Sequence, residues 1–497
     1  MGISKNIMDE KMLSPQHKKV LNPKLDLLGG NSIILNEEQI GAIDKIYRWL
    51  MDNNSENYFT LSGYAGTGKT TCIKRIVEYY KKKVVVSAPT HKAKRVITDI
   101  TKVRGKTLQS LLGLRPDINL DDFNPNDPQF NPIVTPKIGN YSLVIIDEAS
   151  MINSDLFSLI KKLVSGLSTK IIFMGDPAQI PPIGENESVI FFDKTIKKYE
   201  LFKIERQNKD NPLMKVSFLI RNNLLSINGS FKRITKINGS DEGVIFTHDI
   251  EEFKKMLLNK FKSEEFKKDI NYCRIIAWKN KTVKQSNNFI RQNLFNKPKE
   301  TVIRGDVLMG YRTIMDEKMG EIIIENSCDY KVIYCSPLKQ NEFDLYGYDV
   351  KLKEKNIRGD SKITEVFIIE TNDSDNLHNY AEKHDDFKNR AKKDKSLWKL
   401  YYKFRRSSIL MKTIDKYRNN EIRSSGEIIV KDIDYGFAIT AHKSQGSTYT
   451  HVFVIERDMN DNILIKERNQ IKYVALTRPQ KSATVLTSKE LMPHEEI

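Results

Sequence analysis

Short apolar runs separated by amphipathic stretches dominate the N-terminal part of the chain. Four of these runs have the length of a strand: YFTLS (58–62), VVVSA (84–88), LVII (143–146) and IIFM (171–174). The stretch KTTCIKRIVEYY (69–80) has instead the period of a helix, with Ile73, Ile76, Val77 and Tyr80 on one face. Strands that alternate with helices predict a parallel, doubly wound α/β sheet that is buried on both faces.

A second α/β pattern begins later in the chain, in CRIIAW (273–278), FAIT (437–440), HVFVIE (451–456) and ATVLTS (483–488). Between its first two runs lies an insertion with β-like segments (DVLMGY, KVIYC and EVFIIE) and a basic section. We therefore expect a flexible basic leader (1–30), a first domain (31–205), a second domain (206–300 with 433–497) and an insertion (301–432). The Pro- and Asn-rich segment 113–140 predicts a loop or small hairpin inside the first domain.

Composition narrows the class of protein. Hydrophobic residues make up 39% and charged residues 29% of the chain, which is typical of a folded globular protein. The net charge of +17 indicates a polyanionic partner such as nucleic acid, although a lysine-rich soluble protein would show the same surplus. The four cysteines have no metal-ligand spacing, and we find neither a membrane-spanning run nor a signal peptide. These features predict a cytoplasmic protein with reduced thiols.

The stretch LSGYAGTGKTT (61–71) matches the phosphate-binding loop G-x-x-x-x-G-K-[ST] and lies between a predicted strand and a predicted helix. In such a loop the backbone N–H groups surround the phosphates of ATP, the lysine neutralises the β/γ oxygens and the hydroxyl binds Mg²⁺. The predicted nucleotide-binding residues are Gly63, Ala65, Gly66, Thr67, Gly68, Lys69, Thr70 and Thr71.

Acidic and polar residues follow the later strands of the same domain. Asp147 is predicted to hold Mg²⁺ together with Thr70, and Glu148 to activate the attacking water. Gln179, in GDPAQIPP, is predicted to sense the γ-phosphate. Phosphoryl transfer also requires a cation on the developing charge, for which Arg206 and Arg478 are the candidates. Because Arg478 lies in the second half, it would reach ATP only across a cleft between the two halves.

The ordered set GYAGTGKTT, SAPTHKAK, IIDEAS, GDPAQIPP, ERQ, FAITAHKSQGST and YVALTRP resembles the motifs of superfamily 1 helicases. The variants AHKSQG and VALTR resemble the 5′→3′ subgroup that contains Pif1 and RecD, and RIIAWKNKTVKQSNNFIR (274–291) and WKLYYKF (398–404) are similar to a phage member of it. The resemblance covers roughly residues 31–488. It implies two tandem RecA-like P-loop domains with ATP between them, a pin insertion in the first and an SH3-like β insertion in the second.

The resemblance also implies roles for individual residues. Gln39, in LNEEQ, would read the adenine. The backbone of single-stranded DNA would be contacted by two groups that follow strands: Pro89, Thr90, His91 and Lys92, and Thr440, His442 and Lys443. Two positions depart from the subgroup, which commonly has a histidine where this chain has Gln109 and a glycine where it has Ser327.

An aromatic pin would stand against the last base pair of a duplex, because stacking offsets part of the cost of unstacking. Within 113–140 the candidates are Phe123 and Phe130, and Phe130 is favoured by its position 17 residues before Asp147. Alternatively, Phe130 anchors a Pro-rich loop to the domain. The basic segment 386–418 also has two interpretations, since its aromatics have helical packing periodicity while its Lys/Arg side suits a nucleic-acid strand.

Taken together, the motifs predict an ATP-dependent DNA helicase that moves 5′→3′ on single-stranded DNA. We expect it to use ATP and Mg²⁺, to act as a monomer on single-stranded and forked duplex DNA without any membrane, and to meet single-strand-binding or replisome proteins. Two alternatives stay open. One is a superfamily 1 motor that accepts RNA, because backbone contacts alone do not exclude a 2′-OH. The other is an ATP-driven translocase that displaces proteins and unwinds little.

Overall fold

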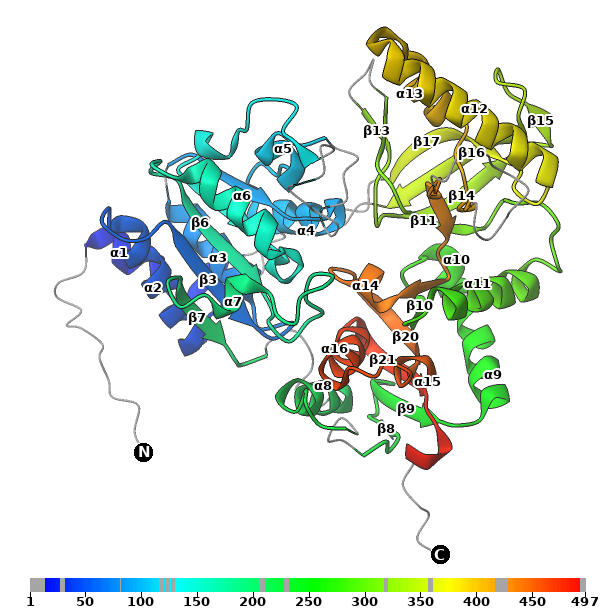
Figure 1. The fold of residues 1–497 in the computed structure, drawn as a ribbon. Helices are drawn as coiled ribbons and strands as arrows, with labels where there is room; N and C mark the ends of the chain where they lie inside the picture. The colour runs from blue at the N-terminus through cyan, green and yellow to red at the C-terminus, as the bar shows by residue number, and fades with distance from the viewer. Residues whose placement is uncertain are drawn as a thin grey trace, which may run out of the picture. The chain divides into compact units, whose positions relative to one another are not determined.

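The computed structural model describes most of the chain, and the fold is drawn in Figure 1. The described residues are 14–26, 32–80, 82–115, 120, 126, 130–204, 211–227, 232–316, 321–355, 361–415 and 428–491. They form two compact units. The first comprises Met1–Pro89, Ala93–Arg115 and Leu120–Lys209, and the second Thr90–Lys92, Pro116–Asn119 and Asp210–Ile497.

The first unit contains a five-stranded parallel sheet. Its strands are β3 (Tyr58–Gly63), β4 (Val84–Ser87), β5 (Leu143–Ile146), β6 (Lys170–Gly175) and β7 (Lys197–Leu201), in the spatial order β4-β5-β6-β3-β7. All four apolar runs of the N-terminal part are therefore strands of one sheet. Its principal helices are α2 (Glu37–Met51), α3 (Lys69–Tyr79), α4 (His91–Thr101) and α6 (Ser154–Val164).

Alternating side chains of β6 explain why its sequence is apolar from Ile171 to Met174. Ile172 and Met174 belong to the same hydrophobic cluster as the buried residues of α2 and α3. Phe173, between them, points to the other face, where its ring lies 5.7 Å from that of Phe157 on α6. Because helices cover both faces, a polar side chain at these positions would be removed from water at a cost in free energy.

The strand register brings three loops to one edge of this sheet. Ser62 of β3 pairs with Gly175 of β6, and Ile146 of β5 pairs with Phe173 of β6. The strands are parallel, so the loops that begin after Gly63, Ile146 and Gly175 leave from the same carboxyl edge. Ligands of open α/β sheets bind at this edge.

The second unit contains a six-stranded sheet of mostly parallel strands. In spatial order these are β19 (Ala438–Thr440), β10 (Cys273–Ala277), β20 (Tyr449–Ile455), β21 (Pro479–Leu486), β9 (Gly243–Thr247) and β8 (Lys236–Ile237). Only the short β8 is antiparallel to its neighbour. Figure 1 shows α9 (Ile250–Phe261) and α11 (Asn280–Leu294) on one side of this sheet and α8 (Pro212–Asn222) and α16 (Ile465–Leu476) on the other. The predicted second α/β half is confirmed.

An antiparallel β-sheet with a helical hairpin is inserted between β10 and β19. Its strands are β11 (Val307–Gly310), β14 (Asp329–Cys335), β15 (Lys339–Gln340), β16 (Tyr346–Lys355), β17 (Ser361–Ile369) and β18 (Ile433–Tyr435). The hairpin consists of α12 (Ser374–Lys393) and α13 (Trp398–Arg406). Among the described residues, every helix is too short or too polar to cross a lipid bilayer. An SH3-like topology for the insertion stays a prediction.

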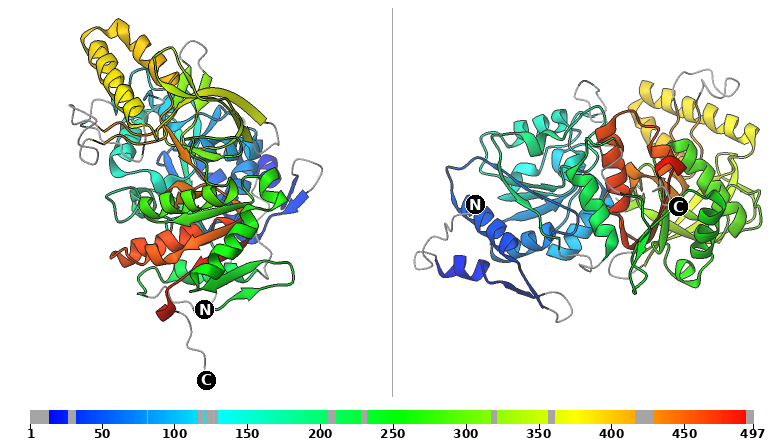
Figure 2. Two further views of the ribbon diagram at one scale, coloured as in Figure 1. Left: turned by 90° about the vertical axis from the view of Figure 1, so that its right-hand side faces the viewer. Right: turned by 90° about the horizontal axis from the view of Figure 1, so that it is seen from below.

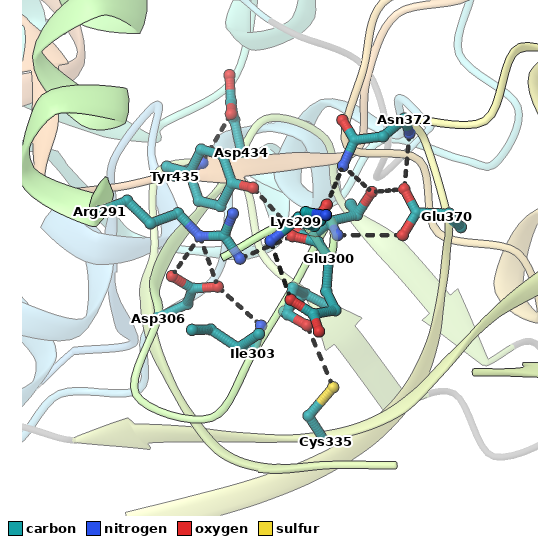
Figure 3. A network of polar contacts seen from close by, with 12 residues as sticks. Arg291, Lys299, Glu300, Ile303, Asp306, Cys335, Glu370, Asn372, Asp434 and Tyr435 are labelled. Atoms are coloured by element: carbon teal, nitrogen blue, oxygen red, sulfur yellow. Dashed lines mark hydrogen bonds and ion pairs between the residues drawn. The ribbon is translucent and has the colours of Figure 1, made fainter. Parts of the chain in front are cut away.

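A buried polar network joins the insertion to the second sheet (Figure 3). Arg291 of α11 donates from Nε to Asp306 Oδ1 over 2.9 Å, at the start of β11. Tyr435, at the end of β18, donates from its hydroxyl to Thr301 O over 2.6 Å, and the Arg291 guanidinium lies 4.8 Å from the Tyr435 ring centroid. The network thus holds together the two places where the chain enters and leaves the insertion.

Candidate active site

The phosphate-binding loop connects β3 to α3. Gly68 precedes the helix with φ of 85°, a left-handed conformation that favours glycine. A Cβ at Gly68 would meet Gln39 Nε2, so a larger residue there would have to displace the Gln39 amide from its bond to Thr67 O. The first N–H groups of α3 have no partner inside the helix, which makes its N-terminus suited to a phosphate group.

Lys69 and Thr67 organise the loop. Lys69 Nζ donates to the carbonyls of Gly63 and Tyr64 over 2.8 and 2.9 Å, so its ammonium curls back over the loop. Thr67 is fully buried, and its hydroxyl donates to the same Tyr64 carbonyl over 3.0 Å. The remaining predicted loop residues are half-buried: Ala65, Gly66, Gly68, Thr70 and Thr71. They therefore present atoms that a nucleotide can contact.

Gln39 supports the loop from behind. Its side chain is 4% exposed, donates from Nε2 to Thr67 O over 3.0 Å, and accepts from Asn36 N to close a capping box at the start of α2. This position links the entry helix to the loop. Reading of an adenine by Gln39 stays a prediction.

Asp147 and Glu148 leave the carboxyl end of β5 at the edge that carries the loop. Burial and the charge of the neighbouring Glu148 raise the pKa of Asp147 to about 7, and the opposing charge of Lys69 shows that its ammonium lies within electrostatic reach. Glu148 has φ of 53°, a conformation that is rare outside glycine and costs energy at an ordinary position. Lys69, Asp147 and Glu148 therefore follow strands at the same edge of the sheet, and their roles in hydrolysis stay a prediction.

Gln179 lies in the loop after β6. Its side chain is 6% exposed, and its N–H donates to Asp176 O over 3.1 Å. Asp176 is fully buried and accepts from Ala178 N, which fixes the turn. The loop is thus well defined, whereas contact between Gln179 and a γ-phosphate stays a prediction.

The two arginine candidates differ. Arg206 lies outside the described residues. Arg478, between α16 and β21 in the second unit, is 5% exposed and donates to Val474 O over 3.0 Å and to Thr477 Oγ1 over 2.8 Å. Its role in hydrolysis stays a prediction.

The residues predicted to contact a strand follow β4 and β19. Pro89 is buried and Thr90 is half-buried, while Thr440 accepts from Lys443 N and caps α14 (Ala441–Ser444). His442 is half-buried, and burial lowers its pKa. Contacts of these residues with DNA stay a prediction.

The sequence did not indicate the partners of Lys92 and Lys443, two of the residues predicted to contact DNA. Residues Thr90–Lys92 belong to the same compact unit as the insertion, in which Lys92 Nζ lies 2.9 Å from Asp329 Oδ2. Lys443 Nζ donates to Asn326 Oδ1 over 2.7 Å. His91 Nδ1 lies 3.6 Å from a Glu325 carboxylate oxygen. Three residues that we predicted to contact a DNA strand, His91, Lys92 and Lys443, therefore lie against the segment 325–329.

The same segment contains a position where the sequence departs from the helicase subgroup. Ser327 has φ of 64°, the left-handed conformation for which glycine is favoured. Serine thus adopts here a backbone conformation that glycine would adopt at lower cost. Gln109, the other departure, is 6% exposed on α5 (Leu108–Leu112). The departure at Ser327 was the one signal in the sequence that pointed to this segment.

Phe130 is 5% exposed, so its ring does not offer the open apolar surface that a pin needs. This burial supports the alternative that Phe130 anchors the 113–140 insertion. Phe123, the other candidate, lies outside the described residues.

Comparisons with known proteins agree with this site. Residues 34–231 match the family described as "AAA domain", and residues 435–486 match the "UvrD-like helicase C-terminal domain". An uncharacterized protein of Acanthamoeba polyphaga mimivirus, R530, is 27% identical over 507 residues, covering 90% of this chain and 98% of the relative. The ATP-dependent DNA helicase dda of Enterobacteria phage T4 is 27% identical over 314 residues, covering 60% of this chain and 67% of the relative.

A solved structure of Pif1 helicases on forked double-stranded DNA has the same fold, with a TM-score of 0.50 at 18% identity over 93% of this chain and 95% of that one. The fold and the site define a P-loop protein with two RecA-like domains in tandem, as predicted. The two family models and the helicase relatives support a helicase of the Pif1/RecD-like subgroup of superfamily 1, similar to dda. Two of the relatives, dda and the RecD2 protein of Deinococcus radiodurans, are ATP-dependent DNA helicases.

Proposed function

We propose that this protein hydrolyses ATP to translocate 5′→3′ along single-stranded DNA and to separate duplex DNA. One observation supports the proposal: the loop that contains Lys69 and the segment that contains Asp147 and Glu148 both leave the carboxyl edge of the first parallel sheet, the edge at which such sheets bind ligands. The helicase relatives point to nucleic acid as the substrate, since dda is an ATP-dependent DNA helicase.

Residues of this chain fit MgATP by their chemistry. The N–H groups of the loop and the Lys69 ammonium are donors for phosphate oxygens, and the Thr70 hydroxyl and Asp147 carboxylate are the oxygen ligands that Mg²⁺ prefers. When bound, the ion would neutralise charge on the phosphates. Glu148 would orient and deprotonate the attacking water, and Gln179 would report on the γ-phosphate.

We also propose that the chain has the domain limits predicted from its sequence, and that it acts as a monomer on single-stranded and forked DNA. The 113–140 insertion is proposed as the element that separates the strands, with Phe130 anchoring it because that ring is buried. Phe130→Ala should then lower thermal stability, ATP hydrolysis and unwinding together. Selective loss of unwinding at unchanged ATP hydrolysis would instead make Phe130 the pin.

Two substitutions test the nucleotide site. Lys69→Ala should lower DNA-stimulated ATP hydrolysis at least ~100-fold, because the phosphate charge loses its partner. Glu148→Gln should keep nucleotide binding and stop turnover. Lys74→Ala is the matched control, since Lys74 lies on the same helix and pairs with Glu78 over 3.8 Å. Normal turnover in both site variants would refute the site.

Strand displacement decides the direction and the substrate. The wild-type protein should open a duplex with a 5′ single-stranded DNA tail and leave the 3′-tailed duplex closed, and Lys69→Ala should open neither. Equal opening of RNA duplexes would favour the RNA-accepting motor. ATP-driven movement without duplex opening would favour the translocase that displaces proteins.

A further inference from the structure

The helical hairpin of the insertion is a rigid scaffold. Its helices α12 and α13 lie side by side in the views of Figures 1 and 2 and pack against each other. The Phe404 ring contacts Tyr380, Phe387 and Phe343 at centroid distances of 5.1 to 5.3 Å. Arg405 is buried and donates to Tyr380 Oη and to Asp432. The packing interpretation of the Phe387 and Phe404 rings is confirmed.

The connecting end of this hairpin carries a dense positive charge. Residues 387–403 contain seven Lys or Arg and one acid, Asp394, which accepts a hydrogen bond from Ser396 N over 2.9 Å. Arg390 pairs with Asp386, and Lys403 pairs with Glu342. Of the five other cations, Lys388 and Lys392 have interactions of their own. The other three are exposed lysines at the connection, on the last turn of α12, on the 3-10 turn Lys395–Leu397 and on the first turn of α13: Lys393, Lys395 and Lys399. Within the described ranges, these three make no ion pair.

A lysine-rich helical surface elsewhere in the same unit differs. Residues 250–269, on α9 and α10 (Glu264–Lys268), contain six lysines and five acids. There Lys254 pairs with Glu251 over 2.7 Å and Lys267 with Glu264 over 2.6 Å. That surface is an ordinary solvated one with balanced charge. The hairpin end is unbalanced, so its lysines repel one another and attract polyanions.

We propose that the connecting end of the α12–α13 hairpin binds the phosphate backbone of nucleic acid through Lys393, Lys395 and Lys399. This contact rests on the proposed function and is separate from the motif residues Thr90–Lys92 and Thr440–Lys443. Lysine suits the role because it meets phosphate as a point charge without reading sequence. The packed hairpin fixes the backbone beneath the lysines, which reduces the ordering cost of binding.

The test compares two triple variants of the full chain with equal loss of charge. One is Lys393→Gln/Lys395→Gln/Lys399→Gln. The matched control is Lys255→Gln/Lys262→Gln/Lys268→Gln, on the balanced α9–α10 surface, where all three lysines are exposed. Affinity for a labelled single-stranded oligonucleotide and for a blunt duplex is measured over a salt series, and thermal melting confirms folding.

The hairpin variant should show a shallower salt dependence. Each lost phosphate contact lowers the slope of log K against log salt by about 0.7 for a single strand and 0.9 for a duplex, so about 2 to 3 in total. The hairpin contacts whichever oligonucleotide, single-stranded or duplex, shows the larger change in this slope. The slopes of the control variant and of the wild-type protein should differ by no more than the change expected for about one phosphate contact.

Two results would overturn the inference: a hairpin variant with the wild-type slope, or equal losses in both variants. Both would leave the proposed function intact, because the wild-type protein still binds nucleic acid. Absence of nucleic-acid binding by the wild-type protein would instead refute the proposed function itself.

Discussion

Glu456 is a buried carboxylate that two cations hold in its charged form. Arg233 donates to its two oxygens over 2.6 and 3.0 Å, and Lys472 Nζ lies 2.9 Å from Oε1. Burial alone would raise the pKa of Glu456, but the hydrogen bond from Arg233 and the charge of Lys472 lower it to about 2. The three side chains are at most 3% exposed. This cluster joins the segment before β8 to α15 (Glu456–Met459) and α16.

The stability of the second unit should therefore depend on pH. A folded-state pKa below the ordinary 4.5 contributes stability that is fully present above pH 4.5 and is lost as pH falls toward 2. The contribution is on the order of 3 kcal/mol. Urea unfolding at pH 3 to 7, followed by hydrogen exchange in α16, measures it.

Substitution at Glu456 isolates this contribution. Glu456→Gln should lower the free energy of unfolding by about 3–5 kcal/mol at neutral pH, because two buried cations lose their counter-ion. It should also remove most of the loss of unfolding free energy that the wild-type protein shows between pH 4.5 and pH 3. The control Glu264→Gln, on an exposed ion pair, should change stability by less than about 1 kcal/mol. An unchanged pH profile in Glu456→Gln would contradict the assignment.

Elements whose strands are apolar throughout could be predicted from the sequence. The runs at 58–62, 84–88, 143–146 and 171–174 became β3 to β6 because helices cover both faces. The strand β7, KKYEL, was missed because it lies at the sheet edge and is largely polar. The strand β16, YGYDVKLKEK, was missed because its charged residues alternate along a partly exposed sheet.

Contacts between distant segments could not be predicted in the same way. The phosphate loop is local, so the roles of Lys69 and Thr70 follow from a short motif. The bonds of Lys443 to Asn326 and of Lys92 to Asp329 join residues more than 100 positions apart. No local periodicity encodes such a pairing. The sequence indicated the lysines and, through Ser327, drew attention to the segment, but it did not indicate that the two are bonded.

The junction of the insertion with the second sheet supplies a test at the scale of elements. Asp306 is fully buried, and burial raises its pKa although Arg291 opposes the shift. Arg291→Met should therefore cost about 3–5 kcal/mol of unfolding free energy, because a buried carboxylate loses its partner. Hydrogen exchange in β11 and β18 should increase first.

A double variant separates charge from packing. Arg291→Met/Asp306→Leu removes both partners and should recover most of the loss, because apolar groups can replace a buried pair at little cost. Equal stability of the single variant and the wild type would show that the pair does not hold the junction. Failure of the double variant to recover would assign the junction to the other bonds of Figure 3, such as Tyr435 to Thr301.

At the scale of the whole molecule, the residues proposed to bind the phosphates and most of the residues proposed to contact a strand belong to different compact units. Lys69 and Glu148 belong to the first unit, whereas Lys443 and the lysines of the helical hairpin belong to the second. An ATP-driven motor must couple such parts, since hydrolysis in one has to change the grip of the other. Arg478 is the residue through which we propose this coupling, because it belongs to the second unit and follows the helicase motif YVALTRP.

Arg478→Ala should lower the kcat of DNA-stimulated ATP hydrolysis at least ~100-fold, as loss of an arginine finger does, while nucleotide affinity changes only a few-fold. Since Arg478 also donates to Val474 O and Thr477 Oγ1, its removal could loosen α16, and thermal melting must accompany the kinetics. Arg468→Ala is the matched control: Arg468 lies on α16, to which Arg478 donates from just beyond its end, and it donates to the Ile227 carbonyl over 2.5 Å and belongs to no helicase motif. It should keep the wild-type kcat. If nucleotide affinity collapses in Arg478→Ala while kcat survives, Arg478 binds nucleotide and coupling passes through another residue. If both variants lose activity and melt early, Arg478 only supports the helix.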